Sequence, residues 1–159
     1  MIEQTLVLVK PDGVARGLIG EIIKRFEQRG LKIVGLKLVK IDKDFSKRHY
    51  AAHVDKKFYI GLEDLITSGP VVAIVIEGVD AIDNVRKICG ATESKSALPG
   101  TIRGDYSHVS YSHADEKKMA VKNVVHSSGN AEDAQNEISL WFSIDELHSY
   151  KRSEDDQVI

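Results

Sequence analysis

The sequence predicts a single α+β domain built on a four-stranded antiparallel sheet. Aliphatic runs at residues 6–9, 33–41 and 71–76 have the character of buried strands, and apolar residues recur at helical spacing between them. The run at 71–76 gives the strongest strand signal, because six consecutive apolar residues follow Gly69-Pro70. A length of 159 residues, with 42% hydrophobic and 29% charged residues, fits one folded domain and is too apolar for disorder.

The first half of the chain predicts two strands and three helices. After the strand at 6–9, Pro11-Asp12-Gly13 predicts a turn, and a helix with its apolar face over residues 18–26 stops at Gly30. The β-branched run at 33–41 is the second strand. Residues 46–68 then have a helical pattern that is broken near Asp55, which predicts two short helices in a hairpin.

The second half repeats this alternation. The strand at 71–76 leads into a helix over 81–89 that ends at Gly90, and residues 92–104 form a long loop without clear periodicity. Residues 119–126 predict the fourth strand, and Asn130 is a suitable N-cap for a last helix whose apolar face ends at Trp141. The core order is therefore β-α-β-β-α-β, the ferredoxin-like arrangement, with helices covering the faces of the sheet.

Composition limits both the location and the partners. The 22 Lys+Arg and 24 Asp+Glu residues give a net charge of −2, which argues against a general nucleic-acid binder. The apolar run at 6–9 meets Lys10 at once, so it is too short for a signal peptide or a membrane span. The single cysteine, Cys89, favours a reducing compartment. We expect a cytoplasmic domain over residues 1–152, with a mobile acidic tail over 153–159 and no membrane partner.

Three groups of residues have the chemistry of a phosphate site. Lys10 follows the first strand, where its ammonium would face a ligand beyond the edge of the sheet. Arg86, Thr92 and Arg103 could supply forked donors and a hydroxyl to phosphate oxygens. His126 lies near the end of a strand, where its imidazole could attack phosphorus.

Each of these residues also has a plainer interpretation. Lys10 alone fits a solvated side chain before a turn, an arginine could pair with Asp105, and a lone histidine is usually structural. His126 needs an acceptor that fixes its tautomer, and Glu137 on the following helix is the candidate.

Other histidines and aromatic side chains could belong to a metal site or to a stacking surface. His49 and His53, four residues apart, lack the further ligands of a metal site. A second histidine-rich segment, with His108, His113 and Asp115, suggests at most a weak one. Aromatic side chains in the helical hairpin fit either a core or a surface that stacks on a nucleobase.

Several motifs, in this order and spacing, resemble nucleoside diphosphate kinases over nearly the whole chain. They are Val9-Lys10-Pro11-Asp12-Gly13-Val14, Arg16-Gly17-Leu18-Ile19-Gly20-Glu21-Ile22, Ser68-Gly69-Pro70-Val71-Val72, Pro99-Gly100-Thr101-Ile102-Arg103-Gly104-Asp105 and Asn123-x-x-His126-x-Ser128. Each motif is moderately specific, and together they outweigh the plainer interpretations of the single residues. The longer segment before the Asn-x-x-His motif resembles an archaeal-type variant of the family.

The resemblance implies a ping-pong transfer of the γ-phosphate of ATP to nucleoside diphosphates through a phosphohistidine, with Mg²⁺ held mainly by the nucleotide phosphates and water. By position, His126 matches the nucleophile and Glu137 the acid that orients its ring. The remaining matches are Tyr50 beside the histidine, Ser128 supporting the site, Phe58 stacking on the base, and Lys10, Arg86, Thr92, Arg103 and Asn123 binding phosphates and sugar. The resemblance also implies a homo-oligomer, with a hexamer favoured.

The sequence departs from the family in three places, and two other functions compete with the enzyme. Gly129 stands where the family usually has an aspartate, the segment Tyr106 to Lys122 is longer than in most members, and the loop Thr92 to Pro99 lacks the usual Asn-Pro after the threonine. The presence of His126 together with every phosphate-binding residue argues against a non-catalytic regulatory relative. An RNA-binding domain of this fold would carry aromatic residues on a central strand, and residues 71–77 have none.

Overall fold

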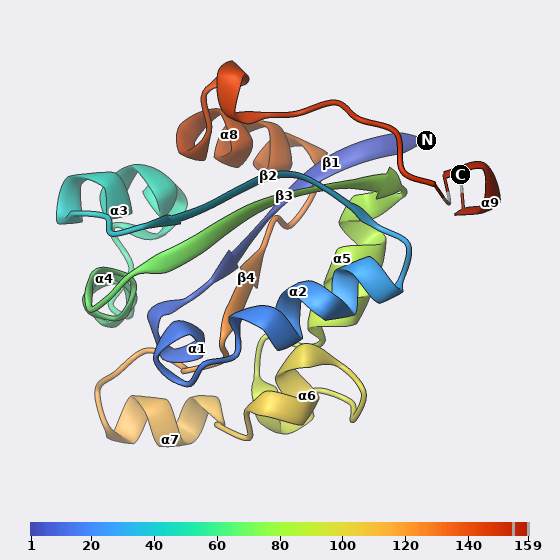
Figure 1. The fold of residues 1–159 in the computed structure, drawn as a ribbon. Helices are drawn as coiled ribbons and strands as arrows, with labels where there is room; N and C mark the ends of the chain where they lie inside the picture. The colour runs from blue at the N-terminus through green and yellow to red at the C-terminus, as the bar shows by residue number, and fades with distance from the viewer. Residues whose placement is uncertain (154, 159) are drawn as a thin grey trace.

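A computed structural model describes residues 1–153 and 155–158 of the chain (Figure 1). The elements are β1 (Ile2–Val9), α1 (Pro11–Ala15), α2 (Ile19–Gln28), β2 (Lys32–Val39), α3 (Lys43–His49), the 3₁₀ turn η1 (Ala51–His53), α4 (Tyr59–Thr67), β3 (Val71–Val79), α5 (Ala81–Cys89), η2 (Ser94–Ser96), α6 (Ile102–Tyr106), α7 (Tyr111–Glu116), β4 (Val125–Ser127), α8 (Ala131–Trp141), η3 (Ile144–Glu146) and α9 (Asp155–Val158).

The four strands form one antiparallel sheet in the order β2-β3-β1-β4. β1 and β3 are central and pair along their whole length, from Ile2 opposite Val79 to Val9 opposite Val72. This order confirms the predicted ferredoxin-like α+β fold. It also brings the end of β1 beside β4, so residues from opposite halves of the chain meet at one end of the sheet.

Helices cover both faces of the sheet (Figure 1). On one face, α2 and α5 pack against alternate residues of β1 and β3, including Val7 and Ile74. On the other face, α4 and α8 pack against the residues between them, including Leu8 and Val75. Because both faces are buried, these strands are continuous apolar runs rather than alternating ones. Among the described residues, no helix has the length and apolar character needed to cross a membrane.

Two predicted elements near the end of β1 are wrong. The turn predicted at Pro11-Asp12-Gly13 is the start of helix α1, because proline suits the first position of a helix. The strand predicted over 119–126 is reduced to β4, which begins at Val125. Val124 has a φ of +62°, a left-handed conformation that interrupts an extended strand.

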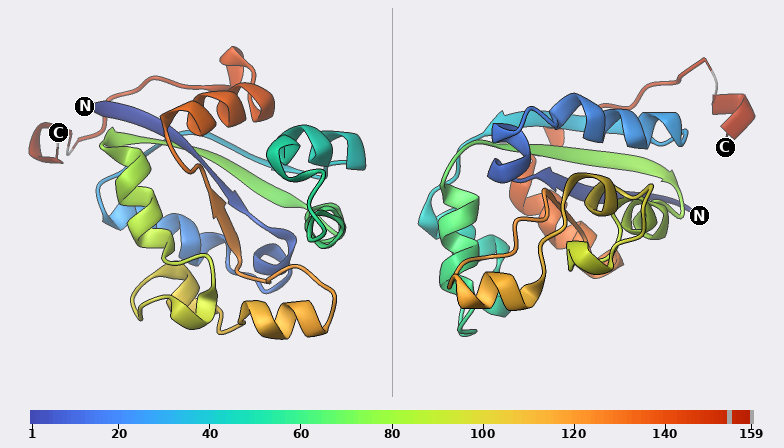
Figure 2. Two further views of the ribbon diagram at one scale, coloured as in Figure 1. Left: turned by 180° about the vertical axis from the view of Figure 1, so that it is seen from behind. Right: turned by 90° about the horizontal axis from the view of Figure 1, so that it is seen from below.

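The long segment between α6 and β4 forms its own small substructure at the end of the sheet that also holds α1 (Figure 2). It contains α7, capped by the Ser110 hydroxyl, which accepts from the backbone N–H of His113. Its return path crosses α4 closely, since a Cβ on Gly61 would lie 2.9 Å from the backbone nitrogen of Ala120. The long segment Tyr106 to Lys122 therefore packs on the domain. The predicted loop over 92–104 likewise contains η2 and the start of α6.

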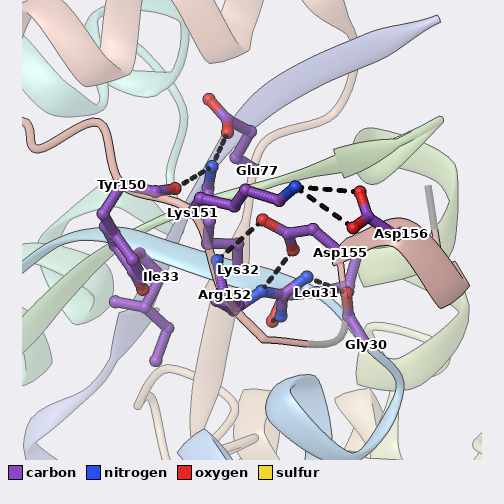
Figure 3. Close-up of polar contacts among 10 residues, drawn as sticks. All are labelled: Gly30, Leu31, Lys32, Ile33, Glu77, Tyr150, Lys151, Arg152, Asp155 and Asp156. Carbon is purple, nitrogen blue, oxygen red and sulfur yellow. Dashed lines mark hydrogen bonds and ion pairs between the residues drawn. The ribbon is translucent and has the colours of Figure 1, made fainter.

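The chain after η3 runs along the outer edge of β2 (Figure 3). The Tyr150 hydroxyl donates to the carbonyl of Ile33 at 2.6 Å, and the Arg152 guanidinium donates to the carbonyls of Gly30 and Leu31. These bonds occupy backbone acceptors that an edge strand otherwise leaves open. Where the sequence predicts a mobile tail, the structure has the short helix α9, and Asp155 pairs with Arg152 at 2.8 Å. Glu154, also part of that prediction, lies outside the described residues.

Candidate active site

His126 of β4 lies opposite Leu8 of β1 and faces α8. Its Nε2 is 2.8 Å from Oε1 of Glu137, and the hydroxyl of Ser128 donates to Oε2 of the same carboxylate at 2.5 Å. The Ser128 oxygen in turn accepts from the backbone N–H of Leu6 at 3.3 Å. The carboxylate is therefore fixed from two sides, and it fixes the histidine ring.

This contact determines the tautomer of His126. An ionised carboxylate only accepts hydrogen bonds, so the proton of the neutral imidazole is on Nε2 and the lone pair is on Nδ1. Burial raises the pKa of Glu137, but the hydrogen bonds and charge of His126 and the bond from Ser128 outweigh it and lower that pKa below its ordinary value. The side chain of His126 is 25% exposed. The unprotonated Nδ1 therefore belongs to a ring that is partly open to solvent.

Lys10 and Asn123 form a second polar cluster at the end of β1. The Lys10 side chain is buried, and its ammonium donates to Oδ1 of Asn123 at 2.5 Å and to the carbonyl of Val121 at 3.3 Å. Asn123 donates to the carbonyl of Thr92 at 2.6 Å. Burial lowers the pKa of Lys10 to about 8, opposed by the charge of Asp12 and assisted by that of Arg103. Within the described residues this ammonium has no carboxylate in direct contact, so it has capacity for an anionic ligand.

The two arginines have different surroundings. Arg103 is buried on α6 and donates to the carbonyls of Gly90 at 2.7 Å and Val125 at 2.9 Å. Its Nε is buried and has no hydrogen-bond partner in the described part of the chain, and burial lowers the pKa of the guanidinium. Asp105, a possible partner in the sequence, pairs with Arg25 instead. Arg86 is exposed on the last turn of α5, with its Nη1 3.8 Å from where a Cβ on Gly129 would lie.

A row of aromatic rings connects His126 to the outer surface of the helical hairpin. Ring centroids are 4.8 Å apart for His49 and His126, and 4.5 Å apart for His49 and Tyr50. The row continues through His53 to Phe58, whose rings are 5.6 Å apart. Tyr50 is buried, and burial raises the pKa of its hydroxyl, so it stays neutral. Phe58 is 55% exposed, which leaves a flat apolar face open to a ligand.

Backbone strain is held directly beside the histidine. Val124 is β-branched, and the left-handed conformation costs such a residue about 1–3 kcal/mol. Its N–H donates to Oδ2 of Asp12 at 3.0 Å, and its carbonyl accepts from the N–H of Lys10 at 2.9 Å. These bonds connect α1 and the end of β1 to the residue two positions before His126, so they fix where β4 begins.

The chain matches the family model described as nucleoside diphosphate kinase over residues 3–147. The chain belongs to the nucleoside diphosphate kinase family. It is 53% identical to the nucleoside diphosphate kinase of Pyrococcus abyssi over 153 residues, which cover 96% of this chain and 92% of that one. The resemblance found in the sequence motifs is thereby confirmed, and with it phosphoryl transfer between nucleotides as the function of this phosphotransferase.

Two solved structures of the family are similar over almost their whole length. One is a transition-state mimic of the Borrelia burgdorferi nucleoside diphosphate kinase with bound vanadate and ADP, with a TM-score of 0.95 at 43% identity, covering 99% of this chain and 96% of that one. The other is a halophilic nucleoside diphosphate kinase from Halobacterium salinarum in complex with CDP, with a TM-score of 0.87 at 46% identity, covering 98% and 97%. Binding of nucleotides is therefore part of the chemistry of this fold.

Hydrogen bonds join six of the predicted residues into two groups. The other four, Arg103, Tyr50, Phe58 and Arg86, are connected to these groups less directly or not at all. His126, Glu137 and Ser128 form one group, and Lys10, Asn123 and the Thr92 backbone form the other. Arg103 joins them through the carbonyl of Val125, while Tyr50 and Phe58 join through the row of rings. Arg86 has no bond to the rest and lies near Gly129.

The sequence alone indicates no role in the site for two residues, Asp12 and His49. Asp12, expected in a turn, anchors Val124, and its place in the first turn of a short helix that begins Pro-Asp-Gly is the only local signal for it. For His49, the sequence suggests only a metal site with His53, a pair that lacks further ligands. In the described part of the chain, the only cluster of three ligand-type side chains is His49, His126 and Glu137, with ligand atoms within 4.8 Å of one another. The histidine-rich segment of α7 forms no such cluster.

The Glu137→Gln variant tests the role of the carboxylate. An amide can still accept a bond from Nε2, but it carries no charge to stabilise the imidazole as positive charge develops. We expect phosphoryl transfer at saturating nucleotide to fall roughly 10- to 100-fold, measured by coupled assay. Glu132→Gln, on the exposed first turn of the same helix, serves as the matched control. Equal rates for the two variants would contradict the assigned role.

Proposed function

We propose that the chain transfers the γ-phosphate of ATP to nucleoside diphosphates in two half-reactions through a phosphohistidine at His126. The lone pair on Nδ1 attacks the γ-phosphorus, the bond from that phosphorus to the bridging oxygen breaks, and the nucleoside diphosphate leaves. The phosphoryl group then passes to a second diphosphate by the reverse steps. The observation that carries this proposal is the Nε2 contact with Glu137, which leaves Nδ1 unprotonated on a side chain that is 25% exposed.

Phosphate binding is assigned to the cations at the end of β1 and on α5 and α6. Phosphoryl transfer depends mainly on positioning and on neutralising the oxygens of the transferred group. Lys10 and Arg103 are held by neutral carbonyl and amide oxygens rather than carboxylates, so their charge is uncompensated by direct ion pairs. Exposed Arg86 and the hydroxyl of Thr92 complete the donors, and Asn123 positions Lys10 and contacts the sugar. Tyr50 and Ser128 support the histidine and its carboxylate.

Magnesium fits this site as a partner of the nucleotide. Mg²⁺ requires oxygen ligands and retains several water molecules. Both oxygens of Glu137 are already bonded, and Asp12 uses one oxygen on Val124 while the other is buried. The metal would therefore be held by phosphate oxygens and water, with no dedicated protein ligand. When bound, it would neutralise charge on the phosphates beside Lys10, Arg86 and Arg103.

Base binding is assigned to Phe58, and Phe58→Ala tests it. Stacking on an aromatic face contributes roughly 1–3 kcal/mol per base and does not discriminate strongly between bases. We expect the Kd for ADP, GDP and CDP to rise by similar factors, between about 5- and 150-fold, in calorimetric titrations. Ile60→Ala, 70% exposed on α4, is the control and should leave all three affinities unchanged. A loss confined to purines would show base-specific recognition instead.

We also propose the cellular compartment, the domain bounds and the oligomeric state of the enzyme. The single cysteine, Cys89, which is buried and free, supports a reducing, cytoplasmic compartment. We assign the catalytic domain to residues 1–152 and a short acidic tail to 153–159. The family membership supports a homo-oligomer, with a hexamer favoured, which sedimentation of the purified protein would test.

The phosphohistidine itself is tested by mapping the label. Protein incubated with Mg²⁺ and γ-labelled ATP is digested under alkaline conditions, which preserve phosphohistidine, and the labelled peptide is identified. We expect a single acid-labile label on the peptide that contains His126. Label on another histidine would assign the nucleophile elsewhere.

A further inference from the structure

His49, the last residue of α3, lies against the ring of the proposed nucleophile. The two ring planes are 82° apart, with centroids at 4.8 Å, so an edge of one ring meets the face of the other. On its other sides His49 contacts the rings of Tyr50 at 4.5 Å and Trp141 at 5.4 Å. His49 is thus packed between Tyr50, His126 of β4 and Trp141 of α8.

Trp141 fixes which nitrogen of His49 carries the proton. The indole Nε1 donates to Nδ1 of His49 at 3.2 Å, and an indole N–H can only donate. Nδ1 therefore holds a lone pair, and the proton is on Nε2. That atom is buried and has no hydrogen-bond partner among the described residues. An unpaired buried donor costs about 1–3 kcal/mol, so its retention beside the active site calls for a function.

The groups around His49 keep it neutral. Burial and, to a smaller extent, the charges of His126 and His53 lower the pKa of His49 to about 3, against the opposing charge of Glu137. Tyr50, the remaining titratable group in contact, is itself neutral because burial raises its pKa. Near neutral pH, the ring of His126 therefore meets an uncharged ring.

We propose that His49 is a positioning residue for phosphoryl transfer, whose neutral ring, fixed by Trp141 and packed edge to face against His126, holds His126 in the geometry for attack. The inference rests on the proposed nucleophile, His126. A ring nitrogen of each histidine and a carboxylate oxygen of Glu137 lie within 4.8 Å of one another. A small rotation of the His126 ring would break its bond to Glu137 and aim Nδ1 away from the phosphorus.

Neutrality at His49 also favours the transferred state. Phosphorylation at Nδ1, with the proton kept on Nε2, places positive charge on the His126 ring beside Glu137. A cation 4.8 Å away would oppose that charge, whereas a neutral donor leaves the attraction of Glu137 undiminished. The hydrogen bond from Trp141 occupies Nδ1, the nitrogen at which His49 would otherwise gain a second proton.

Two variants separate the parts of this proposal. His49→Phe keeps an aromatic wall but removes both nitrogens, and Trp141→Phe keeps His49 but removes the donor that fixes its tautomer. His113→Phe, on the exposed face of α7, is the control. For each protein we would measure, from pH 5 to 9, the rate of phosphoenzyme formation at saturating γ-labelled ATP, the KM for ATP and the Tm.

We expect His49→Phe to lower the rate of phosphoenzyme formation roughly tenfold to a hundredfold, with the KM for ATP changed less than about twofold. Trp141→Phe should lower this rate at every pH tested, because it removes the hydrogen bond that fixes the His49 ring while burial still keeps that ring neutral. A wild-type rate in His49→Phe would overturn the proposal. So would a wild-type rate in Trp141→Phe, since that result indicates that the fixed ring orientation has no effect on the transfer.

The same experiment separates this inference from the proposed function. Wild-type protein that carries no label on the His126 peptide would overturn the nucleophile assignment, and the inference with it. Label on that peptide in the wild type, at an unchanged rate in both variants, would overturn the inference alone.

Discussion

His126→Ala is expected to abolish phosphoenzyme formation and nucleotide exchange while the protein still binds ADP. The methyl group of alanine cannot attack phosphorus. Glu137 and Ser128 remain beside the vacated position, and no described side chain there replaces the imidazole as nucleophile. The proposed binding residues, Lys10, Arg103 and Phe58, are left in place by the substitution. The check combines filter-bound label from γ-labelled ATP with calorimetric titration of ADP. We expect no detectable label and a Kd within a few-fold of that of the wild type.

His113→Ala provides the matched control for this variant. His113 is exposed on α7, so its loss should leave both labelling and affinity unchanged. Labelling of His126→Ala at the wild-type level would contradict the assigned nucleophile. Loss of ADP binding together with the label would instead mean that the histidine organises the phosphate site.

Lys10→Met is expected to have the second largest effect. Methionine keeps most of the volume of the buried stem but removes the ammonium that Asn123 and the Val121 carbonyl orient. Loss of one preorganised donor to a transition state lowers the rate by about 10²–10³-fold. We expect kcat/KM to fall by that factor in a steady-state assay, with the Tm unchanged or raised because a buried charge is removed.

The pH dependence gives an independent check on Lys10. Because burial lowers its pKa to about 8, the ammonium is charged below that pH and neutral above it. We expect kcat/KM, which reports the free enzyme, to fall as the pH rises through about 8. Bound phosphate restores the charge, so kcat should fall at a higher pH. A kcat/KM that stays flat to pH 10 would contradict the assignment.

Lys32→Met is the control for both tests of Lys10. Lys32 is also buried, but it pairs with Glu77 at 2.7 Å and donates to the carbonyl of Tyr150 at the far edge of the sheet. Its loss should lower the Tm and leave kcat/KM and its pH profile unchanged.

The sequence predicts those parts of the fold that depend on local pattern. Continuous apolar runs identify β1 and β3 because both faces of these central strands are buried, and the β-branched and aliphatic run identifies the edge strand β2. Asn130 caps α8 as expected, accepting from the N–H of Asp133. The motif spacing also predicts the family, and the structure brings the motif residues to one end of the sheet.

The failures have a common physical cause in contacts between distant parts of the chain. Residues 119–124 have strand propensity, but Asp12 and Lys10 hold Val124 in a left-handed conformation that no local pattern signals. The acidic C-terminus lacks an apolar face, and bonds from Tyr150 to Ile33 and from Arg152 to Gly30 and Leu31 bring the chain before it against the domain. His49 likewise has no local mark of its contact with Trp141, 92 residues away.

The most direct test of the central claim is a pulse and chase with purified protein. The protein is labelled with γ-labelled ATP and Mg²⁺, separated from nucleotide, and mixed with unlabelled GDP or CDP. We predict an acid-labile, base-stable label on the protein that moves completely to GTP or CTP during the chase. Exchange between nucleotides without any label on the protein would show direct transfer and contradict the account.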